Sequence, residues 1–476
     1  MIKLILKGYR FMDFCTLLMT DKIPTPDYKS MHEWDSYQAQ LTIEYEQSFD
    51  EGKDVESLHD LFQAVADLPA SQEKAALANI LYYMVLKAPM RKNYSYNEPS
   101  DYAGIQKLRS SQPHTSELPS RESLRQRIQG AWYGRICGCW LGKPIEGFSR
   151  ADIEILLRGT NNWPMKHYIQ QKDISPELRN QFTFDVYNRC YADILEHAPA
   201  DDDTNYTVIA GELIERYGKD FSHKNLANLW MSIQAKTAYC TAERVAFRNI
   251  VNGYTAPDSA RHKNPYREWL GAQIRADYFG YINPGNPHAA AEMAWRDASL
   301  SHTKNGIYGA MFIAAMLARA AVSTDIADVI QSGLSEIPST SRLYKSISEM
   351  LNWEKRGETF QDVIERIYDQ YDEQKIHQWT HTIPNAMIVT AGLLYGEGDY
   401  ERSVCLTVQS AFDTDCNGAT IGSIVGMMSG INAIPDNWLQ PLHGTLETNL
   451  SGMEKIDIDA LVERTLNHIY TFPAST

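Results

Sequence analysis

Two short clusters of aspartates are the residues of this chain whose type and spacing are best suited to chemistry. One cluster is Asp413 and Asp415 in SAFDTDCNGATIGSIVGMMSG, and the other is ADDDT, which holds Asp201, Asp202 and Asp203. Carboxylate oxygens are the ligands that hard divalent cations such as Mg²⁺ and Mn²⁺ prefer. Two such clusters suit a pair of metal ions about 3.5–4 Å apart.

A purely structural explanation exists for each cluster taken alone. Aspartate is favoured at helix N-caps because its side chain accepts hydrogen bonds from the free amides of the first turn. Both clusters, however, open glycine-rich or aliphatic helical patterns within one chain. Capping alone requires no such matching context, so we favour a shared metal site.

Glycines recur every four residues in two helical segments near these clusters. Glycine inside a helix costs about 1 kcal/mol relative to alanine, so a regular stripe predicts that another backbone comes very close. One stripe precedes Glu146 in GAWYGRICGCWLGKPIEG, and the other follows Asp415. We expect the three helix ends to meet and to hold metal between them. The stripes are Gly130, Gly134, Gly138 and Gly142, and Gly418, Gly422, Gly426 and Gly430.

Helical spacing of hydrophobic residues runs along most of the chain, and strand-like alternation is scarce, so we predict an all-α protein. Ser120 is expected to cap the first glycine-rich helix, and Asp202 to cap Asn205–Tyr217. Segment 252–286, rich in glycine, proline and aromatic residues, is predicted to be a loop over a site. Further helical patterns cover Met31–Phe49, Val55–Leu68, Gln72–Leu86, Ile153–Arg158, Phe182–His197, Asn225–Ile250, Pro287–Leu300, Ile307–Val322, Asp325–Gly333, Thr340–Glu354, Phe360–Tyr371, Ile383–Leu394, Tyr400–Phe412 and Ile458–Tyr470.

The composition bounds the class of protein. Hydrophobic residues make up 43% of the 476 positions, which is ample for a packed core, and the formal net charge is −15. That charge argues against nonspecific binding to nucleic acid or to an anionic membrane surface. The first residues, MIKLILKGYRFMDF, lack the apolar core of a secretory leader, and no 18 apolar residues run together. The seven cysteines form no metal or disulfide pattern, so we expect a reduced, cytoplasmic protein.

Changes of composition divide the chain into three parts. Residues 1–93 carry helical periodicity without a catalytic motif and are predicted to be a helical appendage. Residues 94–119 are polar, with serine clusters and several prolines, and are predicted to be a linker. The main catalytic domain is expected over residues 120–476. The sequence makes no prediction of an oligomeric state.

From Arg121 to Pro435 the chain resembles the ADP-ribosylglycohydrolase family, which includes the enzyme that reactivates ADP-ribosylated dinitrogenase reductase. The family's G-x-x-x-G helix that leads to a mobile glutamate matches GRICGCWLGKPIEG and reaches Glu146. Its T-D-D-T metal motif matches DDDT, and its closing D-x-D-T motif matches DTDC. The resemblance implies a compact orthogonal bundle of many helices with two bound Mg²⁺ ions, or Mn²⁺, and leaves 1–119 as an N-terminal helical extension.

The resemblance also implies which residues hold the metal. Asp201 stands where the family has a threonine ligand, and Cys416 stands where another threonine would complete the coordination. A thiol is a poor partner for Mg²⁺, so Cys416 leaves one position to water, to Asn417 or to a shifted ion. The extra carboxylate of Asp201 partly compensates. The implied ligands are Asp201, Asp202, Asp203, Asp413, Asp415 and Cys416.

Substrate contacts carry over less completely. LSHTKNGIYGAM resembles the family's histidine-bearing helix start and implies a ligand-contacting His302, although a buried core histidine is the alternative. The family's G-N-G loop leading to an arginine is EWLGAQIR here, with only Gly271 and Arg275 in register. Arg275 could pair a phosphate or belong to an ion pair. Asn417 completes the candidate substrate contacts.

The activity that the resemblance implies is hydrolysis of an N- or O-glycosidic bond at C1 of ribose, in an ADP-ribosylated protein or a small ADP-ribosyl compound. Glu146 and Asp415 are the candidate catalytic residues, with Glu146 in general acid–base work or as a gate at the metal. One alternative is a glycosidase whose nucleoside or sugar conjugate lacks the diphosphate. The other is a noncatalytic ligand-binding member, against which the intact Glu146 and the core aspartates speak.

Overall fold

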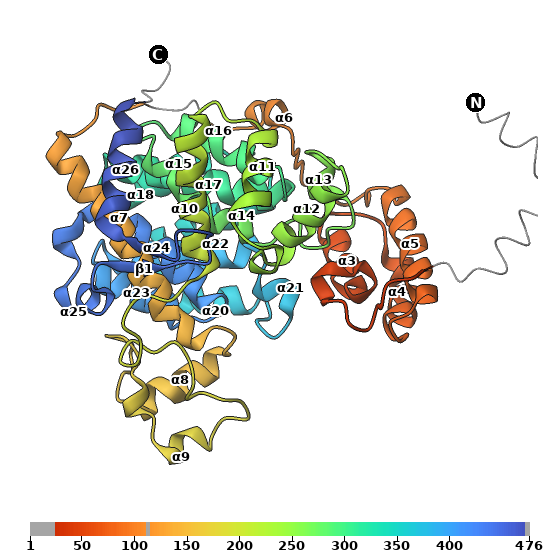
Figure 1. Ribbon diagram of the computed structural model, residues 1–476, viewed down its shortest axis with the longest axis horizontal. Coiled ribbons are helices and arrows are strands. Elements are labelled where there is room, and N and C mark those ends of the chain that lie inside the picture. The colour runs from red at the N-terminus through yellow and green to blue at the C-terminus, as the bar shows by residue number, and fades with distance from the viewer. Residues whose placement is uncertain (1–23, 111–114, 472–476) are drawn as a thin grey trace, which may run out of the picture.

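The computed structural model describes residues 24–110 and 115–471, and within them it confirms the all-α class (Figure 1). The strands of these residues are β1 and β2, which form one short antiparallel pair. The prediction made for MIKLILKGYRFMDF lies outside the described residues. The elements are η1 (Glu33–Asp35), η2 (Tyr37–Ala39), α3 (Leu41–Asp50), η3 (Glu56–Leu58), α4 (His59–Ala66), α5 (Gln72–Lys87), α6 (Tyr102–Lys107), α7 (Arg121–Gly142), η4 (Lys143–Ile145), α8 (Arg150–Gly159), η5 (Gln171–Asp173), α9 (Pro176–Arg179), α10 (Asp202–Tyr217), α11 (His223–Ile233), η6 (Lys236–Ala238), α12 (Thr241–Val251), α13 (Asp258–Arg261), α14 (Gly271–Ile274), α15 (Asp277–Tyr281), α16 (Pro287–Ala298), α17 (Lys304–Ala320), α18 (Ile326–Ser335), α19 (Arg342–Lys355), α20 (Phe360–Tyr368), α21 (Ile376–Trp379), α22 (Thr382–Gly396), α23 (Tyr400–Val408), α24 (Thr414–Ser429), η7 (Ile431–Ala433), α25 (Asp436–Leu439), η8 (Gln440–Leu442), β1 (Thr445–Glu447), β2 (Lys455–Asp457) and α26 (Ile458–Thr471).

The two glycine-rich helices, α7 and α24, pack directly against each other in antiparallel directions. A Cβ atom built on Gly138 would lie 1.9 Å from the carbonyl oxygen of Gly418, and one built on Gly422 would lie 2.1 Å from that of Gly134. Such distances exclude any larger side chain, so the stripes let the two backbones touch. The antiparallel contact brings the C-terminal end of α7 beside the N-terminal end of α24.

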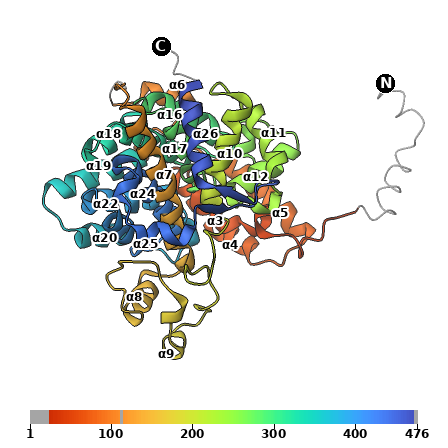
Figure 2. The same cartoon turned by 60° about the vertical axis from the view of Figure 1, so that its left-hand side comes forward.

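Around this pair the remaining helices form the main body, in which α17 is almost entirely buried (Figures 1 and 2). Its hydrophobic core is continuous from α7 to α26. Ser120 caps α7 as predicted, because its side chain accepts a hydrogen bond from the amide of Ser123. The segment with α8 and α9 protrudes from one end of the body.

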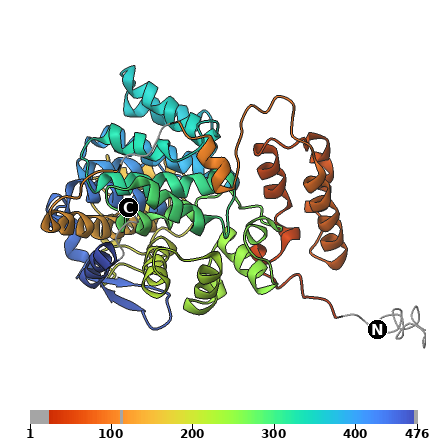
Figure 3. The same cartoon turned by 90° about the horizontal axis from the view of Figure 1, so that it is seen from above.

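The N-terminal unit, α3 to α5, lies beside the main body, next to α12 and α13 (Figures 1 and 3). It has a small hydrophobic core of its own, which includes Leu41, Phe62 and Leu81. A second cluster joins Trp34 and Ile43 to the main body. The segment predicted to be a linker contains α6, which is capped by Asp101.

Three local predictions differ from the structure. The helix predicted over Phe182–His197 is absent, because Asp185 turns the chain by accepting hydrogen bonds from the amide of Tyr187 and the side chain of Asn188. The pattern over Asn225–Ile250 is divided into α11, η6 and α12. The cap of α10 is Asp201 rather than Asp202, since the Asp201 side chain accepts from the amide of Asp203.

Segment 252–286 is largely buried and contains α13, α14 and α15, so it is a packed part of the body rather than a loop, and its residues 269–271 lie at a pocket described below. None of the helices in the described ranges combines the length and apolar character that crossing a membrane requires. The six cysteines in these ranges are all free.

Candidate active site

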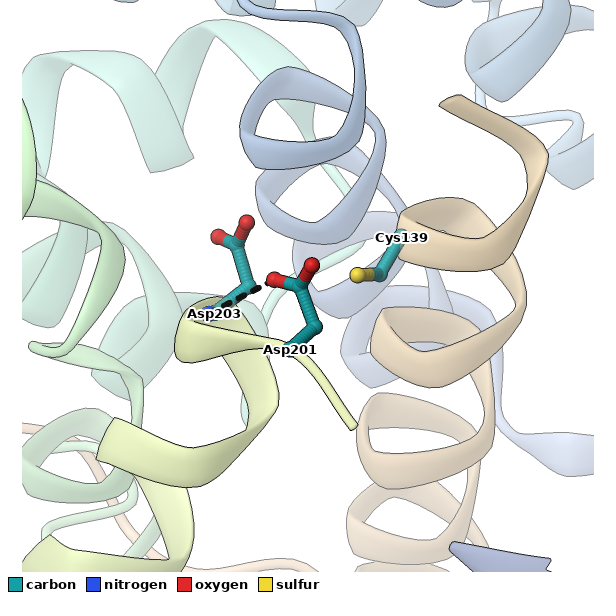
Figure 4. Close-up of side chains that lie close together, drawn as sticks. All are labelled: Cys139, Asp201 and Asp203. Atoms are coloured by element: carbon teal, nitrogen blue, oxygen red, sulfur yellow. Dashed lines mark hydrogen bonds between the residues drawn. The ribbon is translucent and has the colours of Figure 1, made fainter. Parts of the chain in front are cut away.

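Carboxylates from three helix ends lie together at the junction of α7, α10 and α24. Ligand atoms of Glu146, Asp413 and Asp415 lie within 4.8 Å of one another, as do those of Asp203, Asp415 and Cys416. Cys139, Asp201 and Asp203 form a third such group, shown in Figure 4. Asp415 and Asp203 each belong to two groups, so the three groups form one continuous cluster.

Lys143, which sequence reasoning did not single out, lies among these carboxylates. Its Nζ is 2.7 Å from Glu146 Oε2, 2.7 Å from Asp201 Oδ2 and 3.0 Å from Asp415 Oδ2. Burial works against its charge, but the surrounding carboxylates raise the pKa of Lys143 well above its usual value. The ammonium group therefore neutralises part of the cluster. The sequence did contain a signal for Lys143, because this lysine directly follows Gly142 and lies three residues before Glu146.

The backbone before Asp413 holds an unusual conformation. Ala411 and Phe412 both have left-handed φ values, 63° and 54°, which residues with a side chain rarely adopt. Asn385 supports the turn, because its Oδ1 accepts from the amide of Asp413 at 3.2 Å and from Nδ2 of Asn417 at 2.8 Å. Strained backbone of this kind concentrates at functional sites, where the surroundings hold it in place.

Arg135 of α7 supports the aspartates of α10. Its buried guanidinium donates to the carbonyl oxygen of Asp203 at 2.7 Å and to Asp277 Oδ2 at 2.8 Å. The interaction fixes the start of α10 against α7. Arg135 thereby orients Asp203, while its closer ion pair is with Asp277.

The donor set fits a divalent cation. Asp203 Oδ2, Asp413 Oδ1 and Asp415 Oδ1 are buried and have no hydrogen-bond partner among the described residues. Burying ionised oxygens without a partner is costly, and a hard cation is the usual compensation. Asp201 and Asp202 lie beside them at the start of α10, and Cys416 follows Asp415. These residues could hold Mg²⁺ or Mn²⁺.

The electrostatics agree with an excess of negative charge. Burial and the neighbouring Asp201 raise the pKa values of Asp202 and Asp203 well above the usual range, and burial together with Asp415 does the same for Asp413. Burial would also raise the pKa of Asp415, but Lys143 outweighs it and lowers that pKa. The charge of Asp415, together with burial, raises the pKa of Glu146 to about 7.

A pocket of about 240 Å³ opens above the cluster. Its floor includes Glu146, Asp202, Asp413, Asp415 and Cys416. Its sides are mostly aromatic and aliphatic and come from α3, α12, α14 and α21 and the segments beside them. The side residues are Glu33, Trp34, Gln40, Ile43, Cys240, Thr241, Glu243, Tyr266, Trp269, Leu270, Gly271, Ile274, Ile376, Trp379 and Thr380.

The predicted substrate residues differ in their relation to this pocket. Gly271 lines it, and a Cβ at that position would lie 2.4 Å from Glu243 Oε1, so glycine lets the carboxylate approach. Arg275 is buried behind the wall, where it pairs with Glu243 and Asp297. Of the two roles predicted for this arginine, phosphate contact and ion pair, the structure shows the ion pair. Asn417 is buried against Asn385.

His302 also lies outside the pocket lining. Its side chain is fully buried, with Nδ1 2.8 Å from Ser301 Oγ and Nε2 without a partner in the described chain. Burial, with Arg275 nearby, lowers the pKa of His302 well below its usual value, so the ring is neutral. Trp34, Gln40 and Ile43 were not foreseen, because their contact with the site is long-range and leaves no spacing pattern in the sequence.

Fold and site together define an all-helical protein with a buried acidic cluster that could hold metal. The family model described as ADP-ribosylglycohydrolase matches residues 120–471. The chain therefore belongs to the ADP-ribosylglycohydrolase family and is a glycosyl hydrolase.

A solved structure named "ADP-ribosylglycohydrolase-related protein complex" is similar at 16% sequence identity and a TM-score of 0.44, over 73% of this chain and 99% of that chain. No curated protein matches this chain.

Proposed function

We propose that the protein hydrolyses an N- or O-glycosidic bond at C1 of ribose in an ADP-ribosylated protein or a small ADP-ribosyl compound, with two Mg²⁺ ions, or Mn²⁺, at the carboxylate cluster. The observation that carries the proposal is the set of partnerless buried oxygens on Asp413 and Asp415, at the floor of a pocket, and on Asp203 beside them. A cytoplasmic location is part of the proposal and is supported by the free cysteines.

The metal, when bound, would supply Lewis-acid polarisation of ribose hydroxyls and of a water molecule. The chain's own residues would hold the metal and transfer the proton. Asp201, Asp202, Asp203, Asp413 and Asp415, with Cys416 beside them, are the proposed ligand set. Asp415 is shared between two of the carboxylate groups and is the central member.

Glu146 is the proposed general acid–base. It follows η4, lies at the pocket floor, and keeps 36% of its side chain exposed, so a substrate atom can reach it. Lys143 holds Oε2 of Glu146 at 2.7 Å and leaves the other oxygen available to hold or accept a proton. Lys143 and Glu146 lie on one short turn, which keeps the Glu146 carboxyl group beside the aspartates of the pocket floor.

A specific observation favours a second candidate, a nucleoside or sugar conjugate without the diphosphate. Among the pocket-lining residues of the described chain there is no lysine, arginine or histidine. A diphosphate held in this pocket would meet no positively charged side chain of the lining, and only bound cations and the starts of α10, α12 and α24 could receive it. Diphosphate binding is normally secured by arginine, lysine or helix N-termini.

Isothermal titration of ADP-ribose in the presence of Mg²⁺, Mn²⁺ or EDTA tests the proposal. We expect binding with either cation and its loss with EDTA. Metal uptake without ADP-ribose binding would select the candidate that lacks the diphosphate. Absence of metal uptake would refute the metal centre itself.

A further inference from the structure

The pocket above the carboxylates has one wall that comes from outside the family-matched region. Trp34, Gln40 and Ile43 line the same cavity as Glu146 and Asp415, yet the family match begins only at residue 120. Trp34 belongs to η1, Gln40 caps α3, and Ile43 lies in its first turn. The N-terminal unit therefore contributes surface to the site.

Ion pairs hold this wall in place at the pocket's edge. Asp35, next to Trp34, is 2.8 Å from Nη2 of Arg244 and 2.8 Å from Nζ of Lys236. The guanidinium of Arg244 also lies over the ring of Trp34, 5.7 Å from its centroid. The contacts come from α12 and η6, which flank the pocket, so the ring of Trp34 is positioned from the main body.

Farther along α3, buried polar contacts attach the wall beside Trp269. Arg267 pairs with Glu44 at 3.0 Å and with Glu51, and Gln47 donates to Glu268 at 2.8 Å. Arg267 and Glu268 directly precede Trp269, which lines the pocket. The N-terminal wall and the aromatic side of the pocket are thus held by one network.

The surface that results is mainly aromatic. Trp34 and Ile43 pack against the cluster that contains Tyr266 and Trp269, and the latter two rings lie edge to face with centroids 4.6 Å apart. Trp379 lines the same cavity. Indole and phenol rings arranged around a small cavity suit the faces of another planar ring.

Three pocket-lining residues carry hydrogen-bond donors without a partner in the described chain. They are Nε2 of Gln40, Oη of Tyr266 and Nε1 of Trp379, all buried. A buried donor without an acceptor is unfavourable, so a small rotation that brings these atoms to an acceptor on the occupant of the cavity would be favourable. The carboxylates in the lining, and the lack of basic side chains noted above for the described chain, disfavour an anionic occupant.

We propose that Trp34, Gln40 and Ile43, together with Tyr266, Trp269 and Trp379, form the subsite for a planar heteroaromatic group that bears hydrogen-bond acceptors and no negative charge. A nucleobase has this chemistry. The inference rests on the second candidate function, the conjugate without the diphosphate, because in such a substrate the group is attached to C1 of the ribose held at the carboxylates. The N-terminal unit is then a specificity-determining part of the enzyme.

Paired titrations of ribose and adenosine into the full-length, Mg²⁺-loaded protein test the subsite. We expect adenosine to bind more tightly than ribose. Trp34→Ala should weaken adenosine binding by about 5- to 150-fold, the range for one lost base–aromatic stack, and should leave ribose binding unchanged. Ile80→Ala, at an exposed position of α5 in the same unit, is the matched control and should change neither affinity.

Two further variants separate recognition from folding. Trp34→Phe keeps a planar ring and should retain most of the adenosine affinity, while Gln40→Leu keeps the approximate shape, removes the donor, and should weaken adenosine by about 2- to 13-fold. Equal affinity of wild-type protein for ribose and adenosine, or equal effects of Trp34→Ala and Ile80→Ala, would overturn the subsite alone. Loss of all metal-dependent ribose binding in the wild type would refute the proposed function as well.

Discussion

At the scale of single residues, opposite charges held close together dominate the site. Lys143 touches three carboxylates, while three other carboxylate oxygens of the cluster have no partner in the described chain. Each charge in such a cluster depends on its neighbours. Removing one group should therefore have effects that differ according to whether it binds metal, moves a proton or supplies countercharge.

Asp415→Ala should abolish metal-dependent turnover and greatly weaken metal binding, because Asp415 belongs to two of the three ligand groups. Helix content should stay near the wild-type value, since Asp415 lies in the first turn of α24 and is not its N-cap, which is Asp413. Metal titration together with circular dichroism checks both points. Asp436→Ala, at an exposed position of α25, is the control; full activity of Asp415→Ala would rule out the metal assignment.

Glu146→Gln should spare metal binding but reduce kcat by about 10²- to 10⁴-fold if the residue is a general acid–base. The amide has nearly the same shape and cannot exchange the proton. Steady-state kinetics with a titration of Mg²⁺ separate the two effects. A change confined to KM would speak against the proton-transfer role.

Lys143→Met should destabilise the metal-free protein, because Asp201, Asp415 and Glu146 lose their shared cation. Removing one partner of a buried ion pair costs about 3–5 kcal/mol, and the 24% exposure of the lysine side chain places the expected loss at the low end. Saturating Mg²⁺ should restore part of the stability. Chemical unfolding with and without Mg²⁺ measures this, and equal losses in both conditions would contradict it.

At the scale of elements, the contact between α7 and α24 determines where the chemistry can take place. The glycines of the two stripes, apart from Gly430, allow the two backbones to touch. Lys143, Glu146 and Asp415, at the adjacent helix ends, are thereby brought together. Gly430, the last glycine of the second stripe, serves another purpose, since it ends α24 with φ +79°. A small change in the spacing of the two helices would move Glu146 relative to Asp415.

Gly422→Ala should destabilise the fold by about 1–3 kcal/mol, the usual cost of overpacking, because the new Cβ would lie 2.1 Å from the Gly134 carbonyl oxygen. Gly211→Ala is the matched helical control: the nearest atom to its Cβ would be Tyr278 at 3.4 Å. The control should be neutral or gain up to about 1 kcal/mol from better helix propensity. Thermal and chemical unfolding of both variants decide the matter, and equal stability of the two would contradict the close-packing argument.

At the scale of the whole molecule, the N-terminal unit is joined to the catalytic body mainly through charged contacts. Asp35 and Glu51 face arginines and lysines of the main body. Burial would raise the pKa of Asp35, but Arg244 and Lys236 lower it to about 2. Arg267 and Lys304 likewise outweigh burial and lower the pKa of Glu51.

These shifts predict an acid-sensitive attachment. A carboxylate whose pKa is depressed on folding stabilises the folded state above its unfolded pKa, and the contribution is lost as the pH falls through the folded pKa. The attachment should therefore be constant above about pH 5 and weaken between about pH 4 and pH 2. Hydrogen exchange of residues 33–51 measured against pH checks this, and Asp35→Asn should give weaker attachment at pH 7 with a shallower dependence. A pH-independent exchange rate would contradict it.

The sequence was most informative where function depends on neighbouring residues. Asp201–Asp203, Asp413, Asp415 and the glycine stripes are local patterns, and helix geometry alone brings them to helix ends or faces. Trp34 and Trp379 could not be placed beside Asp415, because both contacts depend on tertiary packing, for Trp34 across hundreds of residues, and neither tryptophan carries a periodic signal. Motif register located Arg275 but did not reveal that Glu243 and Asp297 would occupy its guanidinium.

The close contact of α7 with α24 also has a consequence for how the chain is made. The hydroxyl of Thr414 bonds the carbonyl oxygen of Gly142, a residue 272 positions earlier. At about 5–20 residues per second during synthesis, α7 waits roughly 14 to 54 seconds before its partner helix has been translated. During that interval its glycine face has no helix to cover it. The growing polypeptide on the ribosome, rather than the finished enzyme, should be the form most in need of chaperones.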